Sequence, residues 1–430
     1  MTVALSARRA ALTPPWVKRS LWKAAREVPS WHIAPALIGD LTDLVAGQSL
    51  VTFTNSSPAW GFNSSGVLVQ PTANVPFIEY DPATGACLGW RIWDAVTNSI
   101  RNNTTAGAVA GTPGTLPTNW GTFFPLSGVT RTVVGTGTEN GIDYLDLRLA
   151  GTPSAAGSYF LQFDNNTSAV ASIGQTWTTS VFLKLASGSL TGINTVLVST
   201  SNRNSIGDVI AAGSTSVTVT SNLRRFSNTF TNPGANTAYE IGLIELQLSG
   251  AAIDITLRIG LPQLERAGAA GPVVKTSGLT ASSTADVASI TGAAFAGIWN
   301  QAAGTIYAEA TVSTSDAQVF IPRATGSSND RMQLAFGTGG QTAVVTSGAI
   351  QAIFSISTAS KKALAFAANN FALAYGSTIE TDTSGTVPTV DYATIGKFDF
   401  GGGASINGYV REMATFKSRR PNANLQAMTP

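Results

Sequence analysis

Residue types that carry out catalysis are scarce in this 430-residue chain, which has one histidine, His32, and one cysteine, Cys87. A Cys/His zinc site and a disulfide within the chain are therefore excluded. Histidine is the usual general base, but His32 lies beside a basic segment, between Trp31 and Ile33, and we expect no Ser-His-Asp triad built on it. Cys87 is expected to be a small buried apolar residue rather than a reactive thiol.

Carboxylate pairs offer the other route to chemistry, since glycoside hydrolysis needs two carboxyl groups roughly 5 to 9.5 Å apart. Asp143 with Asp146, and Glu240 with Glu245, are the pairs closest in sequence. Both spacings are odd, so within one strand the two side chains point to opposite faces. We therefore predict that the chain is not an enzyme, although carboxylates from different strands are not excluded by this argument.

Sugar binding is the alternative that the residue types suggest. Aromatic rings can stack on sugar faces while Asn, Asp and Gln hold the hydroxyls, although each ring taken alone is more often part of a core. Asn-rich stretches at 164–166, 202–204 and 369–370 supply suitable polar groups. The aromatic candidates within the β-like segments are Trp120, Trp177, Trp299, Tyr239, Tyr375 and Tyr392.

Composition narrows the class of protein. Charged residues make up 12% of the chain, about half the usual quarter, and Gly, Ala, Ser, Thr and Asn take their place. The net charge of +2 is too small to indicate nucleic-acid binding, and no apolar run is long enough to predict a membrane span. The length predicts two or three domains.

A basic helix is predicted over residues 13–28, with Thr13 as its N-cap and Pro14 at its first position. Its apolar stripe consists of Val17, Leu21, Ala24 and Val28. This helix packs on its own domain or on symmetry mates, docks onto another component, or lies on a membrane surface. For docking, the residues that we expect to form the anchor are Trp16, Lys18, Arg19, Trp22, Lys23 and Arg26.

Most of the remaining chain shows the alternation of half-buried antiparallel strands. The clearest case is 252–259, where four apolar residues alternate with polar ones. Stretches rich in Gly, Thr, Ser and Pro at 100–119 and 266–285 are predicted to be linkers. The fold class is thus mainly β, with repeated strands that form sandwiches or barrels.

Residues 50–103 contain two apolar runs, a turn at 81–85 and a third run. This segment resembles one found in phage tail, spike and head-fibre proteins. It departs from them at Trp93, Asp94 and Val96, where those proteins carry an acidic-Arg pair. The matching residues are Phe53, Gly66, Val67, Leu68, Asn74, Pro76, Tyr80, Asp81, Pro82, Thr84, Gly85, Gly89, Thr97 and Asn98.

Two further resemblances concern the β-rich regions. The closing sequence at 259–265 is similar to that of carbohydrate-binding jelly-roll modules, and the end of the chain resembles that of concanavalin-A-like, laminin-G-like sandwiches. They imply an N-terminal anchoring region at 1–105, a carbohydrate-binding-module-like jelly roll at 106–265 and a concanavalin-A/laminin-G-like sandwich at 286–430. Laminin-G-like folds sometimes hold calcium, for which Asp382, Asp391 and Asp399 supply hard ligands.

These observations favour a virion spike, head fibre or tail fibre of a tailed phage or gene transfer agent. In this reading the chain anchors to another virion protein (capsid, portal or tail component) and binds host surface polysaccharide as a homo-oligomer, expected to be a trimer. No cofactor other than a structural calcium is expected. The alternatives are a purely structural capsid-decorating or baseplate protein and, third, a capsule depolymerase.

Overall fold

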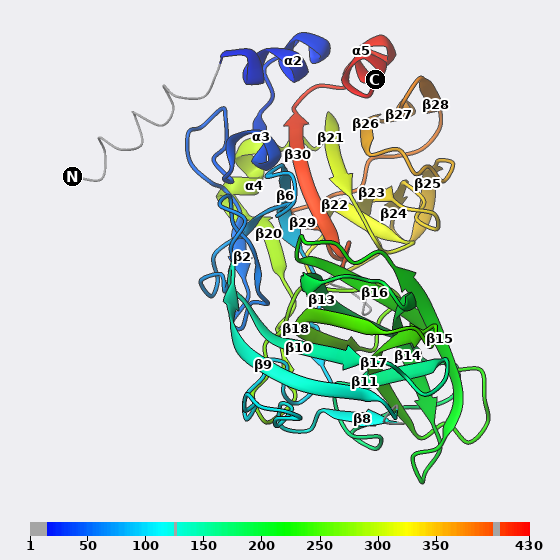
Figure 1. Ribbon diagram of the computed structural model, residues 1–430. Helices are drawn as coiled ribbons and strands as arrows, with labels where there is room; N and C mark the ends of the chain where they lie inside the picture. The colour runs from blue at the N-terminus through cyan, green and yellow to red at the C-terminus, as the bar shows by residue number, and fades with distance from the viewer. Residues whose placement is uncertain (1–14, 124–126, 399–404) are drawn as a thin grey trace.

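The computed structural model describes residues 15–123, 127–398 and 405–430, with side chains described from residue 20 onward. Within these residues the chain is mainly β, every recorded strand pairing is antiparallel, and the helices are short. This confirms the predicted fold class. Figure 1 shows two β-rich bodies, one carrying the blue, yellow and red parts of the chain and the other the green part.

The terminal sandwich combines strands from both ends of the chain. Its eight-stranded sheet places β30 between β21 and β6, and β1 also pairs with β30. The strands of this sheet are β1 (Trp31–Ile33), β5 (Ile78–Tyr80), β6 (Cys87–Ile92), β21 (Ala303–Thr311), β26 (Lys361–Ala367), β27 (Phe371–Tyr375), β28 (Thr378–Asp382) and β30 (Gly408–Phe416).

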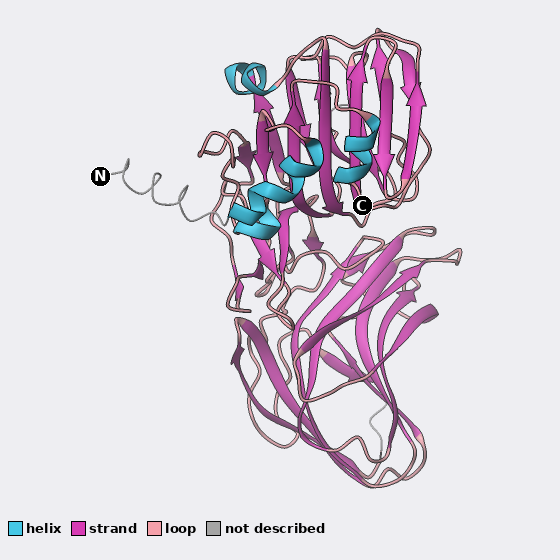
Figure 2. Ribbon diagram, turned by 90° about the horizontal axis from the view of Figure 1, so that it is seen from above, coloured by secondary structure: helices cyan, strands magenta, loops and turns pink. Residues whose placement is uncertain are grey.

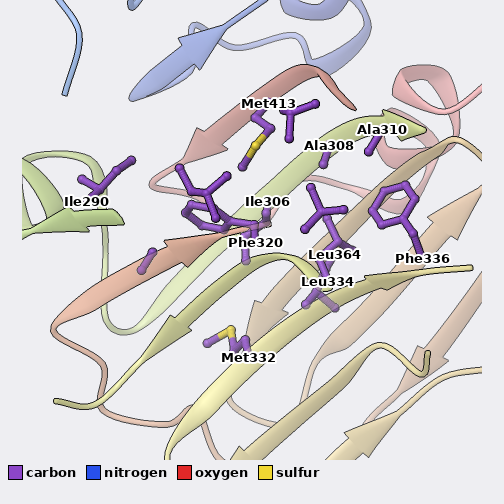
Figure 3. Close-up of a cluster of buried hydrophobic side chains, with 14 of the residues drawn as sticks. Ile290, Ile306, Ala308, Ala310, Phe320, Met332, Leu334, Phe336, Leu364 and Met413 are labelled. Carbon is purple, nitrogen blue, oxygen red and sulfur yellow. The ribbon is translucent and has the colours of Figure 1, made fainter. Parts of the chain in front are cut away.

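A seven-stranded sheet packs against it, in the order β2-β20-β29-β22-β23-β24-β25. Its strands are β2 (Thr52–Thr54), β20 (Val287–Thr291), β22 (Ala317–Arg323), β23 (Arg331–Phe336), β24 (Ala343–Thr346), β25 (Ala349–Ile353) and β29 (Tyr392–Ile395). Apolar side chains from both sheets, among them Ile306, Phe320, Leu334 and Leu364, are fully buried between them (Figure 3). Trp31 and Trp90 join this core, so β1 and β6, which come early in the chain, are hydrogen-bonded and packed into the C-terminal sheets.

The central sandwich lies between these parts in sequence. Its five-stranded sheet consists of β9 (Val129–Glu139), β10 (Ile142–Gly151), β13 (Thr176–Gly188), β16 (Arg224–Thr231) and β18 (Ile253–Glu265). Its six-stranded sheet consists of β8 (Gly121–Phe123), β11 (Gly157–Gln162), β12 (Ala169–Val170), β14 (Ile193–Arg203), β15 (Val209–Val217) and β17 (Tyr239–Leu248). The alternation predicted for 252–259 is observed, since Ile253, Ile255, Leu257 and Ile259 are buried in the core.

The chain enters and leaves the central sandwich through two segments that lie side by side. β7 (Thr97–Asn98) pairs with β19 (Ala281–Ser282), and Asn102 bridges to Ser277. The regions predicted to be linkers or long loops thus contain backbone segments that are hydrogen-bonded to each other near the sandwich. A second short pair, β3 (Gly61–Phe62) with β4 (Leu68–Val69), also lies at this junction.

Buried polar side chains fasten the junction. Asn98 is fully buried; its Nδ2 donates to the carbonyls of Pro262 (3.3 Å) and Val274 (3.1 Å), and its Oδ1 accepts from the amides of Ile100 (3.0 Å) and Leu264 (3.1 Å). All four hydrogen-bonding positions of the amide are therefore occupied. Asn98 belongs to residues 50–103, which resemble phage proteins and are called the virion-like segment below. Pro262 and Leu264 belong to residues 259–265, the closing sequence that is similar to that of jelly-roll modules. The two sequence resemblances therefore meet in one contact.

The N-terminal helix differs from its prediction. The expected cap and first position, Thr13 and Pro14, lie outside the described residues, and the helix α2 is Pro15–Ala25. It ends three residues earlier than expected because Arg26 adopts a left-handed backbone conformation (φ 54°). Val28 is consequently 57% exposed, and Ala25 is buried instead.

The helices lie on the terminal sandwich, visible as cyan ribbons in Figure 2. Leu21 and Ala25 of α2 pack with Leu425 of α5 (Asn422–Met428), and Asn424 donates to the carbonyl of Ala24 (2.8 Å). The remaining helices are α3 (Pro35–Ile38) and α4 (Gly292–Ile298). Across the described residues, no helix has the length and apolar character needed to cross a membrane.

Candidate ligand-binding cavity at the junction

The two sandwiches meet on the outer face of the five-stranded sheet. Ile142 and Phe182 of that sheet form a buried apolar cluster with Leu68 from the β3–β4 pair. Phe62 and Leu223 pack against this cluster and are partly buried. The contact leaves aromatic and aliphatic side chains beside an opening rather than sealing it.

A cavity of about 590 Å³ occupies this opening. Its volume falls in the range typical of small-molecule and sugar sites, and its lining mixes aromatic, aliphatic and hydrogen-bonding side chains. The lining residues are Phe62, Gly66, Asp81, Pro82, Ala83, Leu88, Glu139, Asn140, Ile142, Phe182, Ser221, Asn222, Leu223, Arg224 and Arg225.

One wall is the turn at residues 81–85 of the virion-like segment. Asp81 Oδ1 accepts from the backbone amides of Ala83 (2.7 Å) and Thr84 (3.3 Å), which fixes the turn. Gly85 closes it with φ 70°, a conformation that favours glycine. Asp81 is therefore a structural residue of the wall, and the turn presents Pro82 and Ala83 to the cavity.

The opposite wall carries a fixed ionic cluster. Glu139 accepts from Lys184 Nζ (2.7 Å) and Arg258 Nη1 (2.5 Å), while Arg258 also binds Asp146 in a bidentate pair (2.8 and 2.7 Å). The Arg258 guanidinium stacks on Tyr144, 3.4 Å from the ring centroid. Burial disfavours the ionised form of Glu139, but the hydrogen bonds from Lys184 and Arg258 outweigh it and lower its pKa.

Two arginines line the cavity, of which Arg225 is held by hydrogen bonds and Arg224 is exposed. Arg225 is held by the Gly271 carbonyl (2.6 Å) and the Ser180 hydroxyl (2.8 Å), and burial lowers its pKa. Arg224 is exposed, as is Asn222. These two exposed residues line the same cavity as Phe62 and Phe182, so the lining offers both donors and apolar rings, a combination able to bind a hydroxylated ligand.

The acidic residues of the cavity lining and those singled out from the sequence are held by ion pairs, hydrogen bonds or burial. A general acid of the glycosidase type needs a raised pKa, whereas the pKa of Glu139 is lowered. Asp143 is paired with Lys275 (2.8 Å) and Asp146 with Arg258. Glu240 is fully buried, and Glu245 is partly buried and accepts from the Ser158 hydroxyl (2.7 Å) and the Gln247 amide (3.1 Å).

His32 lies in a buried polar chain within the terminal sandwich. The indole Nε1 of Trp22 donates to His32 Nδ1 (3.0 Å), and His32 Nε2 lies 2.8 Å from Glu412 Oε1. An indole can only donate, so Nδ1 accepts and Nε2 carries the proton towards Glu412. Tyr307 lies 3.4 Å from the other oxygen of Glu412, and burial raises the pKa of this phenol well above its ordinary value.

The remaining sequence candidates are dispersed. Trp120, Trp177 and Trp299 are buried, whereas Tyr239, Tyr375 and Tyr392 are partly exposed on separate strands or strand ends. Cys87 is partly exposed rather than buried, with its thiol 3.5 Å from the Pro35 carbonyl. None of these aromatic residues lines the junction cavity.

The proposed calcium ligands do not form a cluster among the described residues. Asp382 accepts from Ser384 within a local turn, and Asp391 accepts from Thr325, which is 66 positions away in the sequence. Asp399 lies outside the described residues. No group of three or more His, Cys, Asp or Glu suited to a metal is present in the described part of the chain.

Three of the expected anchor residues can be placed. Trp22 is partly buried against the sandwich, Lys23 is exposed on α2, and Arg26 is exposed directly after it. The side chains of Trp16, Lys18 and Arg19 lie outside the described residues.

The cavity residues were not singled out as ligand contacts from the sequence. Phe62 lies more than a hundred positions before Phe182 and Arg224, so no local spacing relates it to them. The available signal was the turn at 81–85, whose resemblance marked the segment without indicating a cavity.

No family model matches the sequence, and no curated protein matches it. Solved structures that align with it include the enzymatically active domain of bacteriophage CBA120 tailspike protein 4 (TM-score 0.24, 16% identity, 34% of this chain and 19% of that chain). The tandem CBM22-1–CBM22-2 domain of Paenibacillus barcinonensis Xyn10C aligns with TM-score 0.24 and 10% identity over 73% of this chain and 100% of that chain. The tripod of the bacteriophage Tuc2009 baseplate aligns with TM-score 0.27 and 10% identity, covering 79% of this chain and 99% of that chain. The chain spans about a fifth of the tailspike chain, and similarity at this level assigns no function.

Proposed function

We propose that the chain is a non-enzymatic virion spike or fibre protein that binds a host cell-surface polysaccharide. The observation that carries this proposal is the junction cavity, one wall of which is the turn of the virion-like segment. In this proposal the central sandwich is a carbohydrate-binding jelly roll and the terminal sandwich a concanavalin-A/laminin-G-like fold.

Sugar recognition would divide between apolar and polar groups of the cavity. The Phe62 and Phe182 rings offer apolar surface to a sugar ring, and Asn222 and Arg224 offer donors to its hydroxyl or acidic groups. The fixed cluster around Glu139 gives the wall a preset shape, which limits the ordering cost of binding. Individual sites of this kind bind weakly, and a trimer would bring several onto one polymer.

Anchoring is assigned to the exposed face of α2. Leu21 and Ala25 hold the helix on the terminal sandwich, and Lys23 and Arg26 remain exposed for a virion partner. The partner would be a capsid, portal or tail component.

The test is binding of the purified chain to an array of bacterial capsular and O-antigen polysaccharides. The double variant Asn222→Ala/Arg224→Ala should weaken binding to any polysaccharide retained by the wild type. Arg148→Ala is the matched control, because Arg148 is an exposed arginine on the same sheet and does not line the cavity. Equal binding by all three proteins, or no binding by the wild type, refutes the proposal.

A structural capsid-decorating or baseplate role is the second candidate. The burial of Trp120, Trp177 and Trp299 favours it, because exposed tryptophans are the strongest stacking platforms that a sugar-binding surface could offer. Cryo-EM of the intact particle separates the two roles. Central sandwiches that project from the particle support attachment, and central sandwiches covered by other virion proteins support the structural role.

A further inference from the structure

A second cavity, of about 300 Å³, opens at the side of the central sandwich where the edge strands β8 and β9 of its two sheets leave a gap. The loop at 109–115 lies over it, fastened by bridges from Val109 to Thr115 and from Gly111 to Val133. The lining residues are Thr112, Pro113, Thr122, Val129, Thr130, Arg131, Leu149 and Tyr159.

Arg131 is the single charged residue among the described residues that line this cavity. Its Nε donates to the Pro113 carbonyl (3.3 Å) and its Nη2 to the Gly114 carbonyl (3.1 Å). These carbonyls hold the guanidinium in place without neutralising it, and no ion pair of Arg131 is recorded in the described part of the chain. The cavity therefore presents an uncompensated positive charge with donors to spare.

Tyr159 supplies an independent observation. It is 5% exposed, and its hydroxyl forms no hydrogen bond of good geometry among the described residues, although the Arg131 guanidinium lies close enough to interact with it. A buried hydroxyl without a partner is costly, so such a group usually meets a water molecule or a ligand. Burial raises the pKa of Tyr159 to about 12 even though Arg131 lies near enough to lower it. The phenol is therefore a neutral donor at physiological pH.

We infer that this side cavity binds a carboxylate-bearing monosaccharide, such as a hexuronate unit. The carboxylate would be held by Arg131 and the Tyr159 hydroxyl, because guanidinium and hydroxyl donors suit its two oxygens. The hydroxyls of Thr112, Thr122 and Thr130 would serve the ring hydroxyls, and Val129 and Leu149 its carbon face. This site is separate from the junction cavity and does not depend on the function proposed there.

The experiment is ligand-observed NMR and calorimetry on the full chain with glucuronate and galacturonate. Binding by the wild type is expected, weakened about 10-fold or more in Arg131→Gln and in Tyr159→Phe, because each change removes a hydrogen bond to a charged group. Arg148→Ala, at an exposed arginine that lines neither cavity, should leave uronate binding unchanged. Unaltered thermal unfolding of Tyr159→Phe would show that the fold is intact.

The neutral sugars glucose and methyl glucuronate, together with inorganic phosphate, complete the design. Weaker binding of all three than of glucuronate supports the inference. It is overturned if glucuronate does not bind, if the neutral sugars bind equally well, or if phosphate binds as tightly. Loss of uronate binding in Asn222→Ala, with the Arg131 and Tyr159 variants unaffected, would also overturn it.

Discussion

Replacing Asn98 with alanine should weaken the connection between the two sandwiches. The change removes four hydrogen bonds of 3.0 to 3.3 Å at a fully buried position. The amides of Ile100 and Leu264 lose their recorded acceptor, and each unsatisfied buried donor costs about 1–3 kcal/mol. The carbonyls of Pro262 and Val274 can still accept other bonds, so we expect a total loss of about 3–5 kcal/mol.

Calorimetry and urea unfolding of the full chain measure this loss, and hydrogen exchange locates it. Protection should fall first at residues 96–104 and 271–284, the two segments of the junction. Asn165→Ala is the matched control, because Asn165 is exposed with no recorded side-chain bond, and it should change stability by less than about 0.5 kcal/mol. If Asn98→Ala costs less than about 1 kcal/mol, or if exchange rises elsewhere first, the assigned role of Asn98 is wrong.

Three further predictions concern the core, the backbone and the surface. Burial raises the pKa of Glu240 to about 7 from an ordinary 4.5, so the folded state favours the protonated acid. This protonated acid contributes its full stability below about pH 4.5, and the free energy of unfolding should fall by about 3 kcal/mol as the pH rises through 7. Glu240→Gln should remove this pH dependence, as measured by urea unfolding at pH 5 and pH 8. Gly89→Ala should lower the free energy of unfolding by about 2–4 kcal/mol in urea unfolding, because Gly89 has φ 122° and an added Cβ would lie 2.5 Å from the Val410 carbonyl oxygen. Gly85→Ala, which has open space around it, should lower it less. Lys23→Glu/Arg26→Glu should lower incorporation of the chain into particles with little change in melting temperature, since both side chains are exposed; unchanged incorporation, measured by quantitative immunoblot of purified particles, would contradict the anchoring role.

The sequence revealed the strands better than their assembly. Alternation at 252–259 correctly placed Ile253 and Ile255 in the core, because side-chain parity in a strand is a local property. Pairing partners are set by contacts distant in sequence, so nothing local indicated that Trp31 and Trp90 would join strands beyond residue 286. The domain limits at 105 and 286 therefore stay predictions about sequence regions, although hydrogen bonds join β1 and β6 to the C-terminal sheets.

In the candidate site, too, local features could be predicted from the sequence and contacts between distant residues could not. The turn at 81–85 was visible because Asp81, Pro82 and Gly85 are turn residues in turn positions. Arg224 and Phe182 carried no signal, since their proximity to that turn arises from the docking of one sandwich on another. The helix ends before the predicted residue 28 because Arg26 breaks it through its own backbone conformation, which the apolar spacing does not reveal.

The paired crossings at the junction have a mechanical consequence. Both α2 and α5 sit on the terminal sandwich, so a particle holding that end and a surface holding the central sandwich would pull across residues 96–104 and 271–284 together. Tension would be shared by these two backbone segments, which are also hydrogen-bonded to each other, rather than carried by a single segment. In the proposed attachment role, a pull on the particle would therefore load both crossings of the junction rather than a single connection.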